Sequence, residues 1–487
     1  MPTGQRTIGV RVGNWASFVR SVPSLRSYSV QLGGLRWTLV ICRSAGLGLF
    51  CRLGFDQTVK DPIRCIIQAN YTIRSAAHPK APSCNHFKGP HLITPKSNAH
   101  LLDGGAYWTQ FTSQQVQAVL RGLSVLDISV RFRVEQILQF GKCPFYHHLL
   151  LPVVDQVCGV SETLQEFYFT HETAQSVQVC AVDLLTASRV RSITSFPRTT
   201  FCSPFYSDDK LQPLFYSSNF DEHKGELAVG HISADFRFHF YCAAVDGQYL
   251  WKADFDISAK SDPRVDYVFP SSTGWVAVTY GWGELCFWLL QGLLSVTQMP
   301  VWDRYPVRRD WFTVAGECIY ILEGHFDRGH LTGVYALDTR AKHPSWRHYC
   351  FLPEICFKLE PRLHNLNGRV LLECCFSRYN NCEKMCDGSL VYELKFEGEF
   401  CLVSAFAQLP PTLGKVMFGE SNVFATDRAY QMLTTIFLQP PTLKQSAMMA
   451  VQKWFGKEHR LDSDFGPETV CHGLDKEVGT ILAHSLL

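Results

Sequence analysis

The sequence predicts an all-β protein in which an antiparallel β-sandwich is followed by a β-propeller of about six blades. Three observations lead to this fold class. Aromatic residues make up 13% of the chain, helical periodicity is scarce, and short apolar runs recur with Gly, Pro, Asn and Asp between them. Aromatic side chains favour the half-buried surface of a sheet. Short runs separated by turn residues are typical of sandwiches, barrels and propellers. The 487 residues leave room for two or three such domains.

Residues 5–140 are the first predicted domain, because their apolar runs follow one another closely with turn residues between them. A Ser-rich turn and a Gly33-Gly34 kink separate the first strands. A short helix with the pattern TSQQVQAVL precedes a long closing strand. In order, the predicted elements are strands at 7–12, 28–32, 35–41, 47–53 and 65–73, a segment at 103–108, a helix at 112–123 and a strand at 125–137.

This succession resembles the MATH (meprin and TRAF homology) domain, an eight-stranded antiparallel sandwich. The marks are Asn14 and Phe18 after the entry strand, the GGLRWTLVI run at 33–41 and the DGGAYW segment at 103–108. The resemblance implies that the domain recognises substrates or receptors, since MATH domains are often paired with BTB domains in ubiquitin-ligase adaptors. The roughly 50 residues after Ile137 show no helical run long enough for a BTB domain.

The resemblance also implies a site. MATH domains that bind short peptides line their groove with aromatic residues from the segment that corresponds to 102–111 here. Asp103, Tyr107, Trp108 and Phe111 are therefore the expected partner-binding residues.

Residues 144–435 are the second predicted domain, and their strands recur with a period. Two interleaved series of strand pairs repeat about every 50 residues, which is the spacing of propeller blades and of kelch repeats. The second series, with Trp346 in one of its strands, resembles the back half of a kelch repeat. Residues 436–487 are predicted to be a tail with a short helix near 442–455, which closes the propeller or packs as an extension. The first series is centred on Phe215, Ala277, Tyr320, Leu372 and Phe424.

Charge and cysteine usage limit the class of partner and the compartment. Lys and Arg (46) nearly balance Asp and Glu (44), so neither nucleic acid nor a membrane is an expected partner. Nineteen cysteines without ordered spacing, many of them in apolar runs, are typical of core thiols in a reducing compartment. No signal peptide or membrane-spanning stretch is apparent, which predicts a cytoplasmic protein. Residues 1–55, with seven Arg and no Asp, Glu or Lys, leave mitochondrial import as a minor alternative.

The sequence contains no phosphate-binding loop, nucleophile elbow or zinc-protease motif. Two clusters were weighed as metal sites. The loop at 324–330 holds two His and one Asp, but a polar hairpin explains it better. The second cluster consists of His364 and four cysteines, and a place in the core explains it better because only the spacing of Cys382 and Cys386 suits zinc. No catalytic residue, metal or cofactor is therefore expected. The four cysteines are Cys374, Cys375, Cys382 and Cys386.

These features together predict an intracellular protein-interaction adaptor rather than an enzyme. Such an adaptor would bind peptides or proteins through the MATH-like groove and the propeller face. One expected form of it is a substrate adaptor of a ubiquitin ligase. Two alternatives remain open at this stage. One is a propeller enzyme with its site at the mouth of the central channel, and the other is a structural scaffold. The partners and the oligomeric state do not follow from the sequence.

Overall fold

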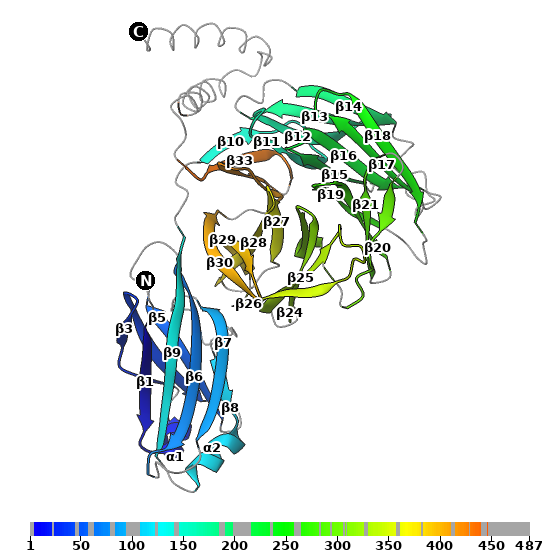
Figure 1. Ribbon diagram of the computed structural model, residues 1–487. Helices are drawn as coiled ribbons and strands as arrows, with labels where there is room; N and C mark the ends of the chain where they lie inside the picture. The colour runs from blue at the N-terminus through cyan, green and yellow to red at the C-terminus, as the bar shows by residue number, and fades with distance from the viewer. Residues whose placement is uncertain are drawn as a thin grey trace.

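The computed structural model confirms the predicted fold class: an antiparallel sandwich is joined to a β-propeller of six blades (Figure 1). The described residues are 4–21, 24–43, 48–56, 63–77, 83–93, 108–121, 125–140, 146–184, 190–197, 216–233, 237–257, 264–281, 284–292, 295–304, 307, 309–325, 330–356, 361–380, 383–410, 414–427, 429–439 and 446.

Two antiparallel sheets form the sandwich, and alternation of apolar and polar residues places one face of each in a shared core. Trp37 lies at the centre of that core, where its ring packs against Phe55 and Phe132 and its Nε1 donates to the Leu32 carbonyl at 3.0 Å. One sheet has the order β1 (Gln5–Val12), β9 (Leu126–Gln139), β6 (Ile63–Ser75), β7 (Cys84–Ile93); the other has the order β2 (Ser24–Arg26), β4 (Leu35–Arg43), β5 (Leu49–Asp56), β8 (Trp108–Phe111), with β3 (Val30–Leu32) paired to β4.

Two elements of the sandwich differ from the sequence-based expectation. The Ser-rich stretch expected to be a turn begins with a short helix, α1 (Trp15–Ser21), because the Asn14 side chain accepts from the Ser17 amide at 3.0 Å and Trp15 and Phe18 pack against the core. Strand β7 was not expected, since Gly89 and Pro90 interrupt its pattern. In the structure these two residues form a bulge on a strand at the edge of the sandwich sheet, where proline is tolerated.

Six four-stranded blades follow among the described residues. Blade numbers below follow this order. Blades four and five are joined into one larger sheet with the sandwich, and η3 (Arg309–Trp311) precedes blade four. The blades are β11 (Gln156–Ser161), β12 (Glu166–Glu172), β13 (Ser176–Asp183), β14 (Val190–Pro197); β15 (Tyr216–Asp221), β16 (Glu226–Ile232), β17 (Arg237–Ala244), β18 (Tyr249–Asp256); β19 (Arg264–Ser271), β20 (Gly274–Gly281), β21 (Glu284–Leu290), β22 (Val296–Gln298); β23 (Phe312–Ala315), β24 (Cys318–His325), β25 (His330–Asp338), β26 (Arg347–Cys356); β27 (Arg362–Leu366), β28 (Arg369–Asn380), β29 (Glu383–Glu397), β30 (Phe400–Leu409); and β31 (Val416–Phe418), β32 (Asn422–Thr426), β33 (Met432–Phe437) with β10 (Tyr146–Leu150).

Strand β10 closes the ring. It follows the sandwich directly in sequence and pairs antiparallel with β33, so the first propeller strand completes the last blade. The predicted period corresponds to the second strands of the last four blades, which contain Ala277, Tyr320, Leu372 and Phe424. Phe215 lies outside the described residues, and the second strand of its blade is β16, farther along the chain. The tail helix expected at 442–455 also lies outside them, except for Ser446.

Hydrogen bonds between the turns of neighbouring blades hold the ring at one end. Glu162, in the turn between the first two strands of blade one, accepts from the Ser421 amide at 3.0 Å and from Asn422 Nδ2 at 2.7 Å, both in blade six. Glu222, in the equivalent turn of blade two, accepts from the Glu162 amide at 2.7 Å. Lys224 Nζ then donates to the Ser271 carbonyl of blade three at 2.9 Å. Carboxylates and a lysine thus make these contacts between blades.

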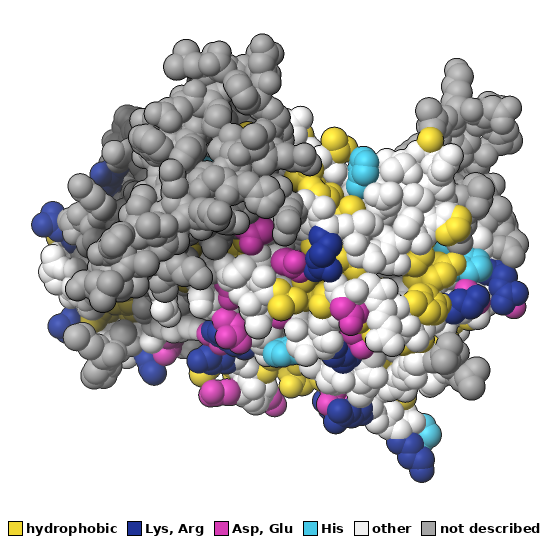
Figure 2. Space-filling model, turned by 90° about the horizontal axis from the view of Figure 1, so that it is seen from above, with side chains coloured by type: hydrophobic (Ala, Val, Ile, Leu, Met, Phe, Trp, Pro, Cys, Tyr) yellow, Lys and Arg dark blue, Asp and Glu magenta, His cyan; other side chains and the backbone are white. Residues whose placement is uncertain are grey.

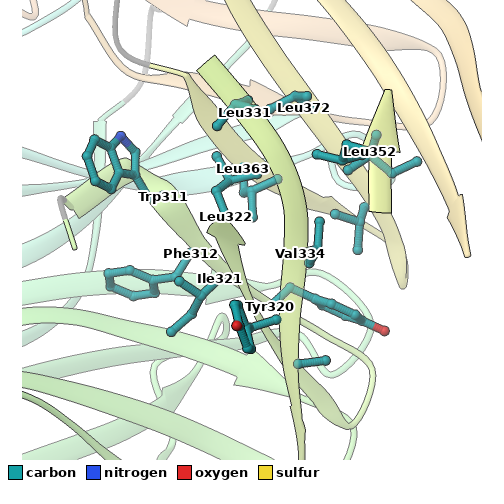
Figure 3. Packing of buried hydrophobic residues seen from close by; sticks show 14 of the residues in the cluster. Trp311, Phe312, Tyr320, Ile321, Leu322, Leu331, Val334, Leu352, Leu363 and Leu372 are labelled. Atoms are coloured by element: carbon teal, nitrogen blue, oxygen red, sulfur yellow. The ribbon is translucent and has the colours of Figure 1, made fainter. Parts of the chain in front are cut away.

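The sandwich and the propeller meet in a shared apolar core. Ile66, Leu92, Leu138 and Phe140 extend from the sandwich into the apolar cluster formed by blades three, four and five. There the Phe140 ring packs edge-on against Tyr392 at a centroid distance of 5.2 Å. Strand β26 also makes a parallel bridge to β7. Figure 3 shows part of the blade cluster, with Trp311, Phe312, Leu322, Leu352 and Leu372 among its labelled side chains.

Candidate functional site

The candidate site lies at the edge of the sandwich where β7 and β8 face each other across the two sheets. Strand β8 carries part of the segment that the sequence predicted to bind partners. Asp103 and Tyr107 lie outside the described residues. Trp108 begins β8, and Phe111 ends it with its side chain fully buried in the sandwich core. Phe111 therefore supports the edge from inside and does not contribute surface to it.

His86 of β7 links the two sheets at this edge. Its ring stacks on Phe111 at a centroid distance of 4.3 Å, and its Nδ1 lies 2.9 Å from Thr109 Oγ1. Its Nε2 lies 3.1 Å from Nε2 of Gln115. The amide nitrogen of Gln115 can only donate, so Nε2 of His86 accepts and Nδ1 carries the proton. Burial and the charge of Lys88 lower the pKa of His86, which favours this neutral form.

A capping box fixes Gln115 in the orientation that this contact requires. Helix α2 (Ser113–Leu120) begins after Thr112, whose hydroxyl accepts from the Gln115 amide at 3.2 Å. The Gln115 side-chain oxygen accepts from the Thr112 amide at 2.8 Å, and its nitrogen therefore points to His86. The sequence predicted this helix, but neither the contact with His86 nor the role of His86 follows from spacing alone.

Beyond this contact, no strand of the described residues pairs with the outer edge of β7 before His91. On the side away from β6, β7 makes its only bridge to a described strand at His91, which pairs with Glu354 of β26. Residues 84–90 have no described strand beside them there. Phe87 is 67% exposed on this stretch, a large fraction for a phenylalanine. An unpaired strand edge presents backbone donors and acceptors to which an extended segment can pair.

A second polar group lies on neighbouring strands of blade five. The Glu373 carboxylate accepts from Ser389 Oγ at 2.6 Å and lies 2.9 Å from His364 Nε2. Burial opposes its ionisation, but the hydrogen bond from His364 and the charges of His364 and Arg362 hold the pKa of Glu373 below its usual range. Glu373 and Ser389 are both fully buried, and the serine donates to the carboxylate rather than to the histidine. We therefore interpret the group as a structural ion pair.

The two clusters weighed as metal sites are placed as follows. His325 ends β24 and His330 begins β25, so the loop is the tip of a blade hairpin, and residues 326–329 between them lie outside the described part. Cys374 lies buried in β28, whereas His364 contacts Glu373 and Phe418. The side chains of the other three cysteines are not among those described. No group of three His, Cys, Asp or Glu side chains gathers as a metal site in the part of the chain that the structure describes.

None of the described helices is long and apolar enough to cross a membrane. Comparison of the sequence with protein-family models and with curated proteins gave no match.

Solved structures similar to the chain are propellers and related proteins. A structure from Bacteroides uniformis, provisionally assigned as a 6-phosphogluconolactonase, matches with a TM-score of 0.34 and 12% identity over 74% of this chain and 90% of its own. The periplasmic gluconolactonase of Pseudomonas aeruginosa matches with a TM-score of 0.32 and 10% identity over 77% and 98%. The propeller domain of the Trilobed protease from Pyrococcus furiosus matches with a TM-score of 0.30 and 8% identity over 56% and 78%.

These similarities correct one prediction. The expectation that the chain is not an enzyme was wrong as an exclusion, because two of the similar structures carry lactonase names. Identities of 8–12% and TM-scores of 0.30–0.34 do not carry a reaction over to this chain.

Proposed function

We propose that the protein is an intracellular protein-interaction adaptor whose sandwich, a MATH-like domain, binds a partner segment at the open edge of β7. The kelch-like propeller provides a second surface, which is held at a fixed angle to the first by the shared core around Phe140. The observation that carries the proposal is the stretch 84–90, whose outer edge has no described strand beside it, together with the exposed ring of Phe87.

The geometry of the edge supports strand addition. Residues 84–88 already form a regular antiparallel ladder with β6, so an incoming segment would meet an ordered template and not a loop. His86 faces inward, where it holds the β8 segment, while the next residue, Phe87, faces outward. Backbone pairing would supply affinity, and contact with Phe87 would select an apolar side chain in the partner.

Recruitment of a ubiquitin ligase is a further step of the adaptor proposal. The resemblance to MATH adaptors supports it, and the recovery of ligase subunits with the protein would be its direct test.

The test compares two surface variants by affinity purification and mass spectrometry. Phe87→Ser removes the exposed ring from the edge, and Tyr28→Ser removes a ring that is also 67% exposed but lies between β2 and β3. We expect Phe87→Ser to lose partners that both the wild type and Tyr28→Ser retain. Retention of every partner by Phe87→Ser, with circular dichroism unchanged, would refute binding at this edge.

A further inference from the structure

Charge is distributed unevenly between the two domains. Residues 5–140 contain sixteen Lys and Arg against five Asp and Glu, a formal charge of +11, whereas the rest of the chain has a formal charge of −9. Twelve of the sixteen are Arg. Figure 2 shows the side of the propeller that lies uppermost in Figure 1, where basic and acidic side chains are intermixed. The near-neutral total of +2 therefore conceals a strongly basic sandwich.

Part of this charge lies on one flat surface, the outer face of the sheet β1-β9-β6-β7. The residues on this face alternate with buried ones and line up in rows across the strands. Glu135, the unpaired residue of a bulge in β9, adds a second carboxylate beside the rows. From the free end of the sheet toward the propeller, the rows are Arg11-Asp127-Arg74, Gly9-Ser129-Thr72-Asn85, Thr7-Arg131-Asn70-Phe87 and Gln5-Arg133-Gln68.

The first row shows how the face holds a carboxylate. Arg11 donates from Nε and Nη2 to the two oxygens of Asp127 at 2.7 and 3.2 Å, a bidentate contact. Arg74 approaches the same carboxylate from the next strand, with its Nε 3.7 Å from Oδ2. One acidic group thus lies between guanidinium groups of β1 and β6.

The rows nearer the propeller carry guanidinium groups without this balance. Arg131 is exposed and makes no ion pair with a described side chain. Arg133 is 61% exposed, and its contact is with Glu135 at 3.2 Å. The two arginines lie two residues apart on β9, so their Cα atoms are about 6.8 Å apart, the repeat of alternate residues in an extended chain.

We propose that this face binds an acidic protein segment in extended conformation, whose alternate carboxylates pair with Arg131 and Arg133. The inference rests on the proposed function and gives the chemistry of its partner. Hydroxyl and amide side chains of the neighbouring rows, such as Thr7, Asn70 and Gln68, are placed to bond the backbone of that segment.

The composition of the face favours an acidic peptide over other anions. A surface that binds single-stranded nucleic acid combines basic groups with several aromatic rings for stacking, and this face has one ring, that of Phe87. A membrane surface selects apolar side chains that insert between lipids, and polar residues dominate here. Arg is the side chain that matches the planar geometry of a carboxylate.

The test measures, by fluorescence anisotropy, the binding of a fluorescein-labelled peptide to the full chain. The peptide alternates Glu and Ser and is about eight residues long, so that it spans β9 from its start to Arg133. Arg131→Glu with Arg133→Glu reverses the charge of the proposed site. The matched control is Arg26→Glu with Arg36→Glu, which makes the same change of net charge with two exposed residues of the other sheet. We expect the first pair to weaken binding roughly tenfold or more and the control pair to change it less than about twofold.

Three outcomes would overturn the inference. Equal weakening by both pairs would show a response to net charge alone. The face would belong to nucleic acid or membrane if an oligouridylate or phosphatidylserine vesicles bound more tightly than the peptide and depended on Arg131 to the same extent. The wild-type protein could also fail to bind the peptide and still capture partners in a Phe87-dependent way. That result would refute binding at this face and leave the proposed function intact.

Discussion

Phe140→Ala should uncouple the sandwich from the propeller. The side chain is 1% exposed and packs against Tyr392 in the cluster shared by the two domains. Truncation of a buried phenylalanine to alanine costs about 3–5 kcal/mol. The four sandwich side chains in this cluster together contribute at most roughly 6–12 kcal/mol, so the variant should remove a large part of the coupling.

The assay for this variant is differential scanning calorimetry of the full chain. At about 2–4 °C per kcal/mol for domains of this size, we expect the transition that includes the sandwich to fall by roughly 6–20 °C and to separate from that of the propeller. Tyr28→Ala removes an exposed ring of the same domain and should change neither. If Phe140→Ala folded and left the midpoint within about 1 °C of the wild type, the two domains would not share a core.

Three further results follow from the structure. Trp37→Ala should destabilise the sandwich by about 3–5 kcal/mol in urea unfolding. Trp37→Phe should destabilise it by about 1–3 kcal/mol, since the Leu32 carbonyl loses its donor; a loss below about 0.5 kcal/mol in Trp37→Phe would discount the hydrogen bond. Leu149→Asp places a charge at a buried position of the strand that closes the ring, so it should lower the propeller's melting temperature. An unchanged melting temperature would contradict closure by β10. Folding lowers the pKa of His86 below its usual value of about 6.5. The unfolded chain therefore binds a proton at this residue more readily than the folded protein does. The sandwich should therefore lose stability as the pH falls below about 6.5, and His86→Phe should weaken that dependence, as urea midpoints at several pH values will show.

The architecture could be predicted from the sequence because its signals are local. The buried alternation in β6 and β9 and the apolar second strands of the later blades depend only on neighbouring residues. Strand β7 was missed because Gly89 and Pro90 normally end a strand, and only its position in the sheet explains why they are tolerated. Closure by β10 was missed because its partner β33 lies at the other end of the domain in sequence.

The sequence predicted Asp103, Tyr107, Trp108 and Phe111 as partner-binding residues, and partner binding there stays a prediction. The aromatic pattern of this segment did not show that Phe111 faces inward. The contacts of His86 with Thr109 and Gln115 join residues from three elements, and no spacing in the sequence encodes them. The basic character of the first 55 residues was visible at once. The rows of arginines on one face draw mostly on residues beyond that stretch, and their alignment depends on the register of β1, β9 and β6.

The central claim is that partners bind the sandwich by adding a strand to β7. Hydrogen–deuterium exchange of the full chain, alone and in complex with the partner recovered by affinity purification, tests it most directly. We expect the amides of the Asn85–Lys88 stretch to exchange more slowly in the complex, while the exchange rates of the β1 amides stay unchanged. Unchanged exchange along β7, with protection confined to the propeller, would contradict it.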